Sequence, residues 1–188
     1  LVRAVPKVRF RLSSVEATEV DARLRERLAE HDGGLVPYLH APLQSGSDRV
    51  LRRMGRHWYT AAAYARAIEH IVRDATVFGL GADVIAGFPG ETDADHQATL
   101  DLVSALPFTT LHVFAYSERA GTAAARLPER VDAHDVARRA RDLRALGKTL
   151  EEQHRARRDG GVADVVVIGD RAHRSGLTED YGSVIPTD

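Results

Sequence analysis

Two turn-rich blocks, each directly after an apolar run, constrain the fold of this chain most. The first reads Tyr38-Leu-His-Ala-Pro-Leu-Gln-Ser-Gly-Ser47, and the second reads Asp83-Val-Ile-Ala-Gly-Phe-Pro-Gly-Glu-Thr92. In a chain that alternates strands with helices, such blocks stand where a buried strand ends and the backbone turns into a helix. Ligands bind at that edge of a parallel sheet. The two blocks therefore predict an α/β fold with a binding site at the carboxyl ends of its strands.

The composition excludes several classes of function. None of the 188 residues is cysteine, so the chain can form neither a disulfide nor a metal site built on thiolates. No apolar run approaches the roughly 18 residues of a membrane span, and no secretory signal is visible, so we expect no membrane partner and a cytoplasmic location. The net charge of −1 leaves no global nucleic-acid footprint. The arginines of 138–158 favour a solvated helix face over an RNA-binding stripe.

The alternation of polar and apolar residues predicts the order of the elements. Strands are expected at 7–13, 36–40, 80–86 and 110–115, and helices at 20–32 (with Thr18 as N-cap and Asp32-Gly33-Gly34 as the stop), 48–54, 61–75, 92–106 and about 132–158. Because strand and helix alternate four times, a parallel sheet with covering helices is predicted. Strands at 162–168 and 175–185 are expected to begin a small all-β unit.

The second block has the features of a ligand-binding turn. Gly87 and Gly90 surround Phe88-Pro89, and glycines at the end of a strand permit a sharp turn and the close approach of a ligand. Thr92, with Asp95 three residues on, begins a helix whose amide groups could face an anion. An ordinary strand-to-helix turn with a good cap would give the same pattern, so both interpretations stay open.

The first block gathers His40, Gln44, Ser45 and Ser47 at another strand end. Glutamine and serine can each donate and accept hydrogen bonds, which suits a ribose or an amino-acid head group. Residues 13–16 and 116–122 are also rich in polar side chains, and each of these segments follows a predicted strand. Because the carboxyl ends of parallel strands point the same way, we expect these four sets to line one rim. A lone histidine here is more often structural, and the roles of His40 and His112 stay open.

Together these segments resemble the tRNA methylthiotransferases, which are radical S-adenosylmethionine enzymes. The resemblance is carried by Arg11-Leu-Ser-Ser-Val-Glu16, by Leu39-His-Ala-Pro-Leu-Gln-Ser-Gly-Ser-Asp-Arg-Val-Leu-Arg-Arg-Met54, by the second block, and by Leu111-His-Val-Phe-Ala-Tyr-Ser-Glu-Arg-Ala-Gly-Thr122, in this order. Ser-Ser-Val-Glu and Gly176-Leu-Thr-Glu-Asp-Tyr181 look most like the branch (MtaB-type) that acts on N6-threonylcarbamoyladenosine. The isopentenyladenosine branch and the ribosomal-protein branch are the alternatives within the family.

The resemblance implies a fold and a reaction. Residues 1–159 would be the later strands and helices of a partial (β/α) radical-SAM barrel, and 160–188 the start of a TRAM-like β domain. The intact enzyme would add a methylthio group to C2 of the adenosine next to the anticodon, using S-adenosylmethionine and two 4Fe-4S clusters. The family's Cys-x-x-x-Cys-x-x-Cys loop is not in this sequence, and the chain opens with Leu1 rather than Met. We therefore expect a fragment that is inactive by itself and has no cluster ligands.

The resemblance also implies roles for particular residues. Eight residues would bind S-adenosylmethionine. Glu16 and Gln44 would contact the ribose and the methionyl head group, with Ser45 and Arg56 nearby and the arginine at the carboxylate. Asp83 and Gly87 would lie near the adenine, and Phe114 and Tyr116 would flank it. The implied partners are the anticodon stem-loop of tRNA and an electron donor such as flavodoxin or ferredoxin.

Two alternatives of other classes remain at this point. One is a catalytically inactive module that binds RNA through its arginine-rich helix and β tail. The other is an α/β domain with an unrelated phosphate or sugar ligand, against which the lack of a Gly-x-Gly-x-x-Gly or Walker loop counts. An open sheet edge near Phe10 predicts that the isolated chain is marginally stable or associates with itself.

Overall fold

The computed structural model describes residues 2–30, 34–169 and 174–185. Its main sheet has four parallel strands in the order β1 (Phe10–Leu12), β2 (Leu35–His40), β3 (Gly79–Ala86) and β4 (Thr110–Ala115). Each strand is parallel to the next one along the chain. The predicted parallel sheet is confirmed, and β1 is an edge strand, shorter than the predicted 7–13.

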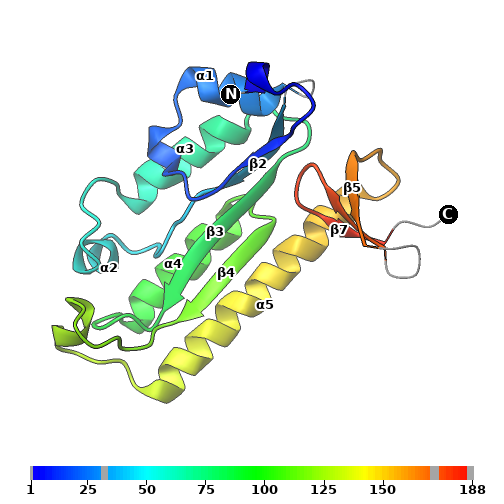
Figure 1. The fold of residues 1–188 in the computed structure, drawn as a ribbon. Helices are drawn as coiled ribbons and strands as arrows, with labels where there is room; N and C mark the ends of the chain where they lie inside the picture. Colours follow the sequence, from blue (N-terminus) through cyan, green and yellow to red (C-terminus); the bar gives the residue numbers. More distant parts are fainter. Residues whose placement is uncertain (1, 31–33, 170–173, 186–188) are drawn as a thin grey trace.

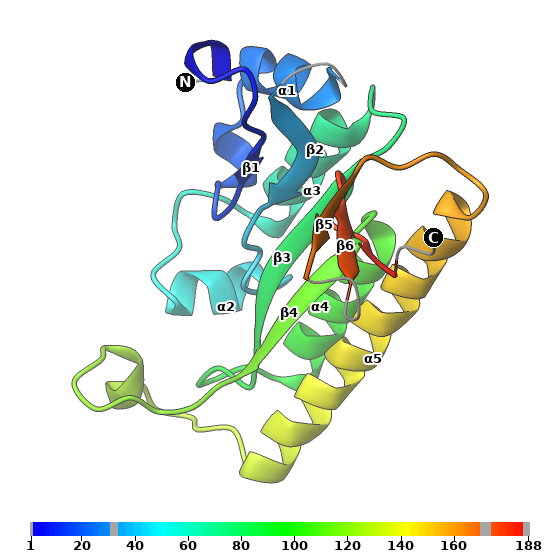
Figure 2. The same ribbon diagram turned by 45° about the vertical axis from the view of Figure 1, so that its right-hand side comes forward.

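The helices lie on one face of this sheet (Figures 1 and 2). They are α1 (Ala22–Ala29), α2 (Asp48–Arg53), α3 (Ala61–Val72), α4 (Asp93–Ala105) and α5 (Ala133–Arg158), with short 3-10 turns at Val2–Ala4, Ala17–Glu19 and Ala124–Arg126. None of the described helices is both long and apolar enough to cross a membrane.

The start of α1 differs from the prediction. Thr18 lies in the 3-10 turn, and the N-cap is Asp21, whose carboxylate accepts a hydrogen bond from the backbone N–H of Leu24 at 2.7 Å. The helix begins after this turn, and the turn places Ala17 in the core, where the residue is 2% exposed. Asp32 and Gly33, part of the predicted helix stop, lie outside the described residues.

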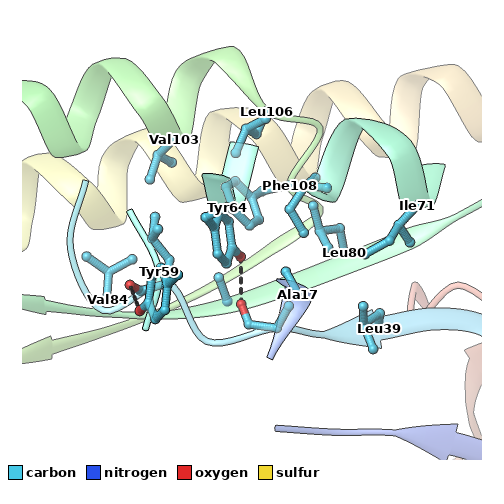
Figure 3. Packing of buried hydrophobic residues seen from close by; sticks show 14 of the residues in the cluster. Ala17, Leu39, Tyr59, Tyr64, Ile71, Leu80, Val84, Val103, Leu106 and Phe108 are labelled. Carbon is cyan, nitrogen blue, oxygen red and sulfur yellow. Dashed lines mark hydrogen bonds between the residues drawn. The ribbon is translucent and has the colours of Figure 1, made fainter. Parts of the chain in front are cut away.

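Strand alternation divides the sheet into an apolar and a polar face. Leu80, Ala82, Val84 and Ala86 of β3 are fully buried beneath the helices, whereas the residues between them face the other side. Figure 3 shows the packing on the helix side, where Tyr64 of α3 is among the largest buried side chains.

Two buried tyrosines attach the first turn-rich block to this core. The Tyr64 hydroxyl donates to the carbonyl of Ala41 at 2.7 Å, and the Tyr59 hydroxyl donates to the carbonyl of Leu43 at 2.9 Å (Figure 3). These bonds help to satisfy carbonyl groups that lie beyond the end of β2, where the backbone no longer follows the sheet. The irregular backbone after β2 is thus attached to the helix side of the core.

A small antiparallel sheet packs on the polar face. It consists of β5 (Val165–Ile168), β6 (Ser175–Thr178) and β7 (Ser183–Val184). The Tyr181 ring lies 4.8 Å from the Tyr38 ring, and the Arg11 guanidinium lies 5.0 Å from the centre of the Tyr38 ring and 4.4 Å from that of Tyr181. This stack covers the part of the face nearest the amino ends of the strands.

Asp180 connects the small sheet to α5. Its carboxylate, which is almost fully buried, lies 2.8 Å from His154 Nε2 and 3.0 Å from Arg158 Nε, and it accepts from the Thr178 hydroxyl at 2.5 Å. Burial raises the pKa of Asp180, but the hydrogen bonds from His154 and Thr178 and the charge of Arg158 lower it to about 2. The ionised carboxylate therefore stabilises the docked arrangement.

We predict that Asp180→Asn lowers the free energy of unfolding by roughly 2 kcal/mol near neutral pH, because a carboxylate whose pKa is depressed contributes stability above its unfolded pKa of about 4. This contribution is lost as the pH falls toward about 2, so the free energies of unfolding of the wild type and the variant should become equal there. Chemical denaturation at a series of pH values measures it. The exposed Asp101→Asn is the control, and a gap between wild type and Asp180→Asn that does not narrow in acid would contradict the assignment.

Candidate functional site

The two turn-rich blocks meet at the carboxyl ends of β2 and β3. The backbone N–H of Gln44 donates to the carbonyl of Asp83 at 2.8 Å, and the Gln44 carbonyl accepts from the N–H of Ile85 at 3.0 Å. Gln44 has a φ of 67°, which is unusual for a residue other than glycine. Strained backbone of this kind concentrates at functional sites, and here the pairing with β3 holds it in place.

The second block turns at Gly87, as predicted. Its φ is +78°, and a Cβ atom there would lie 2.4 Å from a methyl group of Val136 on α5, so a side chain would be strained and would clash. The Gly87 N–H donates to the Glu91 carboxylate at 2.7 Å, and Arg139 of α5 lies 2.9 Å from the same carboxylate. This charge pair is buried, with side chains 5% (Arg139) and 2% (Glu91) exposed.

The predicted cap of α4 is confirmed as a capping box between Thr92 and Asp95. Asp95 also accepts from the Ser47 hydroxyl at 2.6 Å and forms an ion pair with Arg49. Burial raises the pKa of Asp95, but the bonds from Arg49, Ser47 and Thr92 outweigh it and hold that pKa well below its usual range. The amino end of α4 is therefore occupied by a carboxylate of this chain, which favours the structural interpretation of the cap over anion binding.

A cavity of about 440 Å³ opens beside the joined blocks. Four of the eight residues predicted to bind the cofactor line it, namely Gln44, Asp83, Phe114 and Tyr116. Its other lining residues are Ile85, Phe88, Ala115, Ser117, Arg119, Thr122 and Ala124. The rings of Phe88 and Tyr116 meet edge to face at 5.4 Å. The cavity thus combines an aromatic wall with polar groups from three segments of the chain.

The other four predicted residues do not line this cavity. Glu16 and Arg56 form an ion pair at 2.9 Å, with each side chain 23% exposed. Gly87 forms the turn described above. Ser45 is fully buried, and its hydroxyl accepts from the Ser47 N–H at 3.2 Å and lies 3.4 Å from the Thr99 hydroxyl. The structure therefore places Ser45 between the first block and α4.

The sequence did not predict a cluster of His40, Asp83 and His112 on the polar face. His40 Nε2 lies 3.1 Å and His112 Nδ1 lies 3.3 Å from Oδ1 of Asp83. Asp83 and His112 are directly paired on β3 and β4, and His40 is paired with Gly81, two residues before Asp83 on the same face. His40 ends β2, whereas Asp83 and His112 lie within β3 and β4, so the register between the strands was needed to bring them together.

We predict that Arg139→Met lowers the free energy of unfolding by about 3–5 kcal/mol, because it leaves the Glu91 carboxylate buried without its cationic partner. Glu91→Gln keeps an acceptor for the Gly87 N–H, so the double variant should be more stable than Arg139→Met alone. Urea denaturation of the two single variants and the double variant measures the coupling. Additive losses would show that the pair does not support this turn.

Comparison with known proteins identifies relatives with two kinds of name, although no protein-family model matches the chain. It is 40% identical over 179 residues to the tRNA-2-methylthio-N(6)-dimethylallyladenosine synthase of Magnetococcus marinus, a match covering 94% of this chain and 39% of that protein. It is 35% identical over 158 residues to the threonylcarbamoyladenosine tRNA methylthiotransferase MtaB of Bacillus subtilis, covering 84% and 35%, and 36% identical over 161 residues to MtaB of Thermotoga maritima, covering 84% and 37%.

This chain therefore spans little more than a third of the length of these relatives. The identities are 38–46% to the dimethylallyladenosine synthases and 35–36% to the MtaB proteins, so the comparison does not favour the threonylcarbamoyladenosine branch. The resemblance seen in the sequence is confirmed at the level of the family. Over the segment that it spans, this chain belongs to the tRNA methylthiotransferases.

Proposed function

We propose that this chain forms part of the cofactor and substrate site of an enzyme that adds a methylthio group to C2 of N6-threonylcarbamoyladenosine in tRNA, next to the anticodon. The observation that carries the proposal is the cavity at the carboxyl edge of the sheet, lined by Gln44, Asp83, Phe114 and Tyr116. Because the chain spans only part of its relatives, the remaining part of the site would come from other segments of the intact protein.

The topology supports a partial (β/α) radical-SAM barrel for residues 1–159. The strands follow one another in chain order across the sheet, and the helices lie on one face (Figure 2). A singly wound sheet of this kind is the winding of a (β/α) barrel, whereas doubly wound sheets carry helices on both faces. Residues 160–188, which contain the small antiparallel sheet, would begin the TRAM-like domain.

The residues around the cavity fit the parts of S-adenosylmethionine. The aromatic wall of Phe88, Phe114 and Tyr116 suits an adenine ring, and the side chains of Gln44 and Asp83 can bind ribose hydroxyl groups. The Glu16–Arg56 pair offers one group for an ammonium and one for a carboxylate, the two charges of the methionyl end, so that binding would exchange one internal ion pair for two with the ligand. When bound, the cofactor would supply the methyl group and the radical chemistry of the family.

The iron–sulfur clusters do not fit this chain, because it has no cysteine. Their ligands would stand on other segments of the intact enzyme, and the isolated chain would be inactive. The proposed role of the residues present is to bind and orient the cofactor and the nucleoside and to exclude water. The tRNA anticodon stem-loop, a flavodoxin or ferredoxin as electron donor and a cytoplasmic location belong to the same proposal.

The polar residues at the cavity favour threonylcarbamoyladenosine over isopentenyladenosine. Ser117, Arg119 and Thr122 line the cavity together with Asp83. The threonylcarbamoyl group carries a hydroxyl, a carboxylate and amide groups, whereas the isopentenyl group is a hydrocarbon. These side chains can form hydrogen bonds with the polar substituent, whereas a hydrocarbon offers them no partner, so the lining matches the threonylcarbamoyl group better.

Four of the seven arginines of α5 give little support to an RNA-binding stripe. Arg138, Arg139, Arg155 and Arg158 each form ion pairs with carboxylates of this chain. A charge that already has a partner contributes less to phosphate binding, since the existing pair has to be broken first. The interpretation of this helix as a solvated and internally paired element is the one that the contacts favour.

We predict that deleting the gene that encodes this chain removes 2-methylthio-N6-threonylcarbamoyladenosine from cellular tRNA, and that Gln44→Gly in the restored gene leaves at most a tenth of it. Glycine suits the φ of 67°, so this variant removes the side chain without straining the backbone. Mass spectrometry of digested tRNA measures the nucleoside, with the exposed Gln97→Gly of α4 as a control.

The nucleoside profile also distinguishes the alternatives. Loss of the methylthiolated isopentenyl nucleoside instead would keep the family reaction and reassign the substrate. An unchanged profile in the deletion strain would contradict the proposed function.

A further inference from the structure

The His40–Asp83–His112 cluster defined above lies outside the core and outside the predicted cofactor residues, apart from Asp83. It stands on the polar face of the main sheet, beside the cavity that Asp83 and Phe114 line. The small sheet covers the neighbouring part of this face through the Tyr38–Tyr181 contact. The cluster therefore occupies the boundary between the covered and the open part of the face.

The backbone of β3 leaves space for the ring of His40. Its ring extends across β3 toward Asp83, and the residue that it passes is Gly81. A Cβ atom on Gly81 would lie 3.1 Å from His40 Cδ2 and 2.5 Å from the Tyr38 hydroxyl, so any side chain there would displace one of the two rings. The glycine thus leaves room for both rings beside β3.

Hydrogen bonding determines which nitrogen of His40 carries the proton. The backbone N–H of Ser14 donates to His40 Nδ1 at 3.4 Å, so in the neutral ring Nδ1 is the acceptor. His40 Nε2 then carries the hydrogen and donates to Asp83 Oδ1 at 3.1 Å. The sequence Ser14, His40, Asp83 therefore forms a chain of donors and acceptors that ends at a carboxylate turned toward His112.

The same argument disfavours a metal ion in the cluster, although the three residues offer ligand atoms within 4.8 Å of one another. A metal bound to His40 Nε2 would require the proton on Nδ1, where it would face the N–H of Ser14. Histidine ligands normally donate their second N–H to a carbonyl or carboxylate, which is the opposite arrangement. The cluster is better suited to hold a proton on a nitrogen than to hold a cation.

His112 is the member of the cluster that a ligand can reach. Its side chain is 46% exposed, and Nδ1 is the ring atom that lies against Asp83. With a hydrogen on Nδ1 directed at the carboxylate, Nε2 is left as a hydrogen-bond acceptor. In a structure without a ligand such contacts are often loose and tighten on binding, which suits the 3.3 Å separation.

We propose that Asp83, supported by His40, orients His112 so that Nε2 accepts a hydrogen bond from an N–H or O–H group of the N6 substituent of the substrate nucleoside. This inference rests on the proposed function and adds a specificity-determining residue to it. His112 acts in recognition: it discriminates a substituent with donor groups from a hydrocarbon one, because only the former can donate a hydrogen bond to Nε2.

The test is the binding of two nucleosides to this chain, followed by NMR of the histidine side chains. We expect N6-threonylcarbamoyladenosine to bind at least fivefold more tightly than N6-isopentenyladenosine and to shift the Nε2 resonance of His112. His112→Phe should remove this preference, whereas His112→Gln, which keeps an acceptor, should retain part of it. His70→Phe makes the same chemical change on the exposed side of α3 and should leave the preference intact.

Several results would overturn the inference. These are an unchanged preference in His112→Phe, no saturable binding of either nucleoside, and a proton on Nδ1 rather than Nε2 of His40 in the nitrogen spectra. Stoichiometric binding of Zn²⁺ alone that is lost in His112→Phe would instead make the cluster a metal centre. The deletion experiment above separates the two proposals: a normal tRNA profile after deletion contradicts the enzyme function, whereas the nucleoside preference tests only His112.

Discussion

The buried carboxylate of Asp95 is the interaction on which the arrangement of the site depends. It caps α4 through Thr92 and binds Ser47 and Arg49 from the first turn-rich block. One side chain therefore connects the turn after β2 with the turn after β3. A second buried pair, Glu91 with Arg139, connects the same region to α5. The loops at the rim are consequently held by ion pairs whose carboxylates are buried, so the cavity beside them is formed in advance of any ligand.

The two faces of the main sheet have different roles: one packs against the helices, and the other carries the candidate binding groups. Its helix side is continuous apolar packing, and the two tyrosines Tyr59 and Tyr64 extend that packing to the irregular backbone after β2. Its other side carries Arg11, Tyr38, His40, Asp83 and His112, which are polar or aromatic. The small sheet covers one end of this polar face, and the other end opens into the cavity. The groups that could bind a nucleoside are thereby placed on a rigid support.

Much of the fold could be predicted from the sequence because its signals are local. The cap at Thr92, the starts of the helices at 48 and 61, and the strand ends at His40 and Ala86 are each determined by a few neighbouring residues. The predicted start of α1 was wrong. Thr18 and Asp21 are both good N-cap residues, and the burial of Ala17 decides between them.

The details of the site depended on tertiary contacts. The side chain of Ser45 points into the protein because Thr99 of α4 lies behind it, which no local pattern shows. The histidine cluster depends on strand register. The contact of Arg11 with Tyr181 joins residues from the two ends of the chain, and only the folded structure reveals it.

The measurement that tests the account most directly is the binding of S-adenosylmethionine to this chain, mapped by NMR chemical shifts. The account predicts saturable binding with a dissociation constant of about 1 mM, because part of the site lies on other segments and fewer contacts offset the cost of ordering the ligand. The shifted resonances should belong to Gln44, Asp83, Phe114 and Tyr116. Shifts confined to the small sheet and the end of α5, or no saturable shift at concentrations several times higher, would contradict the claim that the carboxyl edge of the main sheet is the cofactor site.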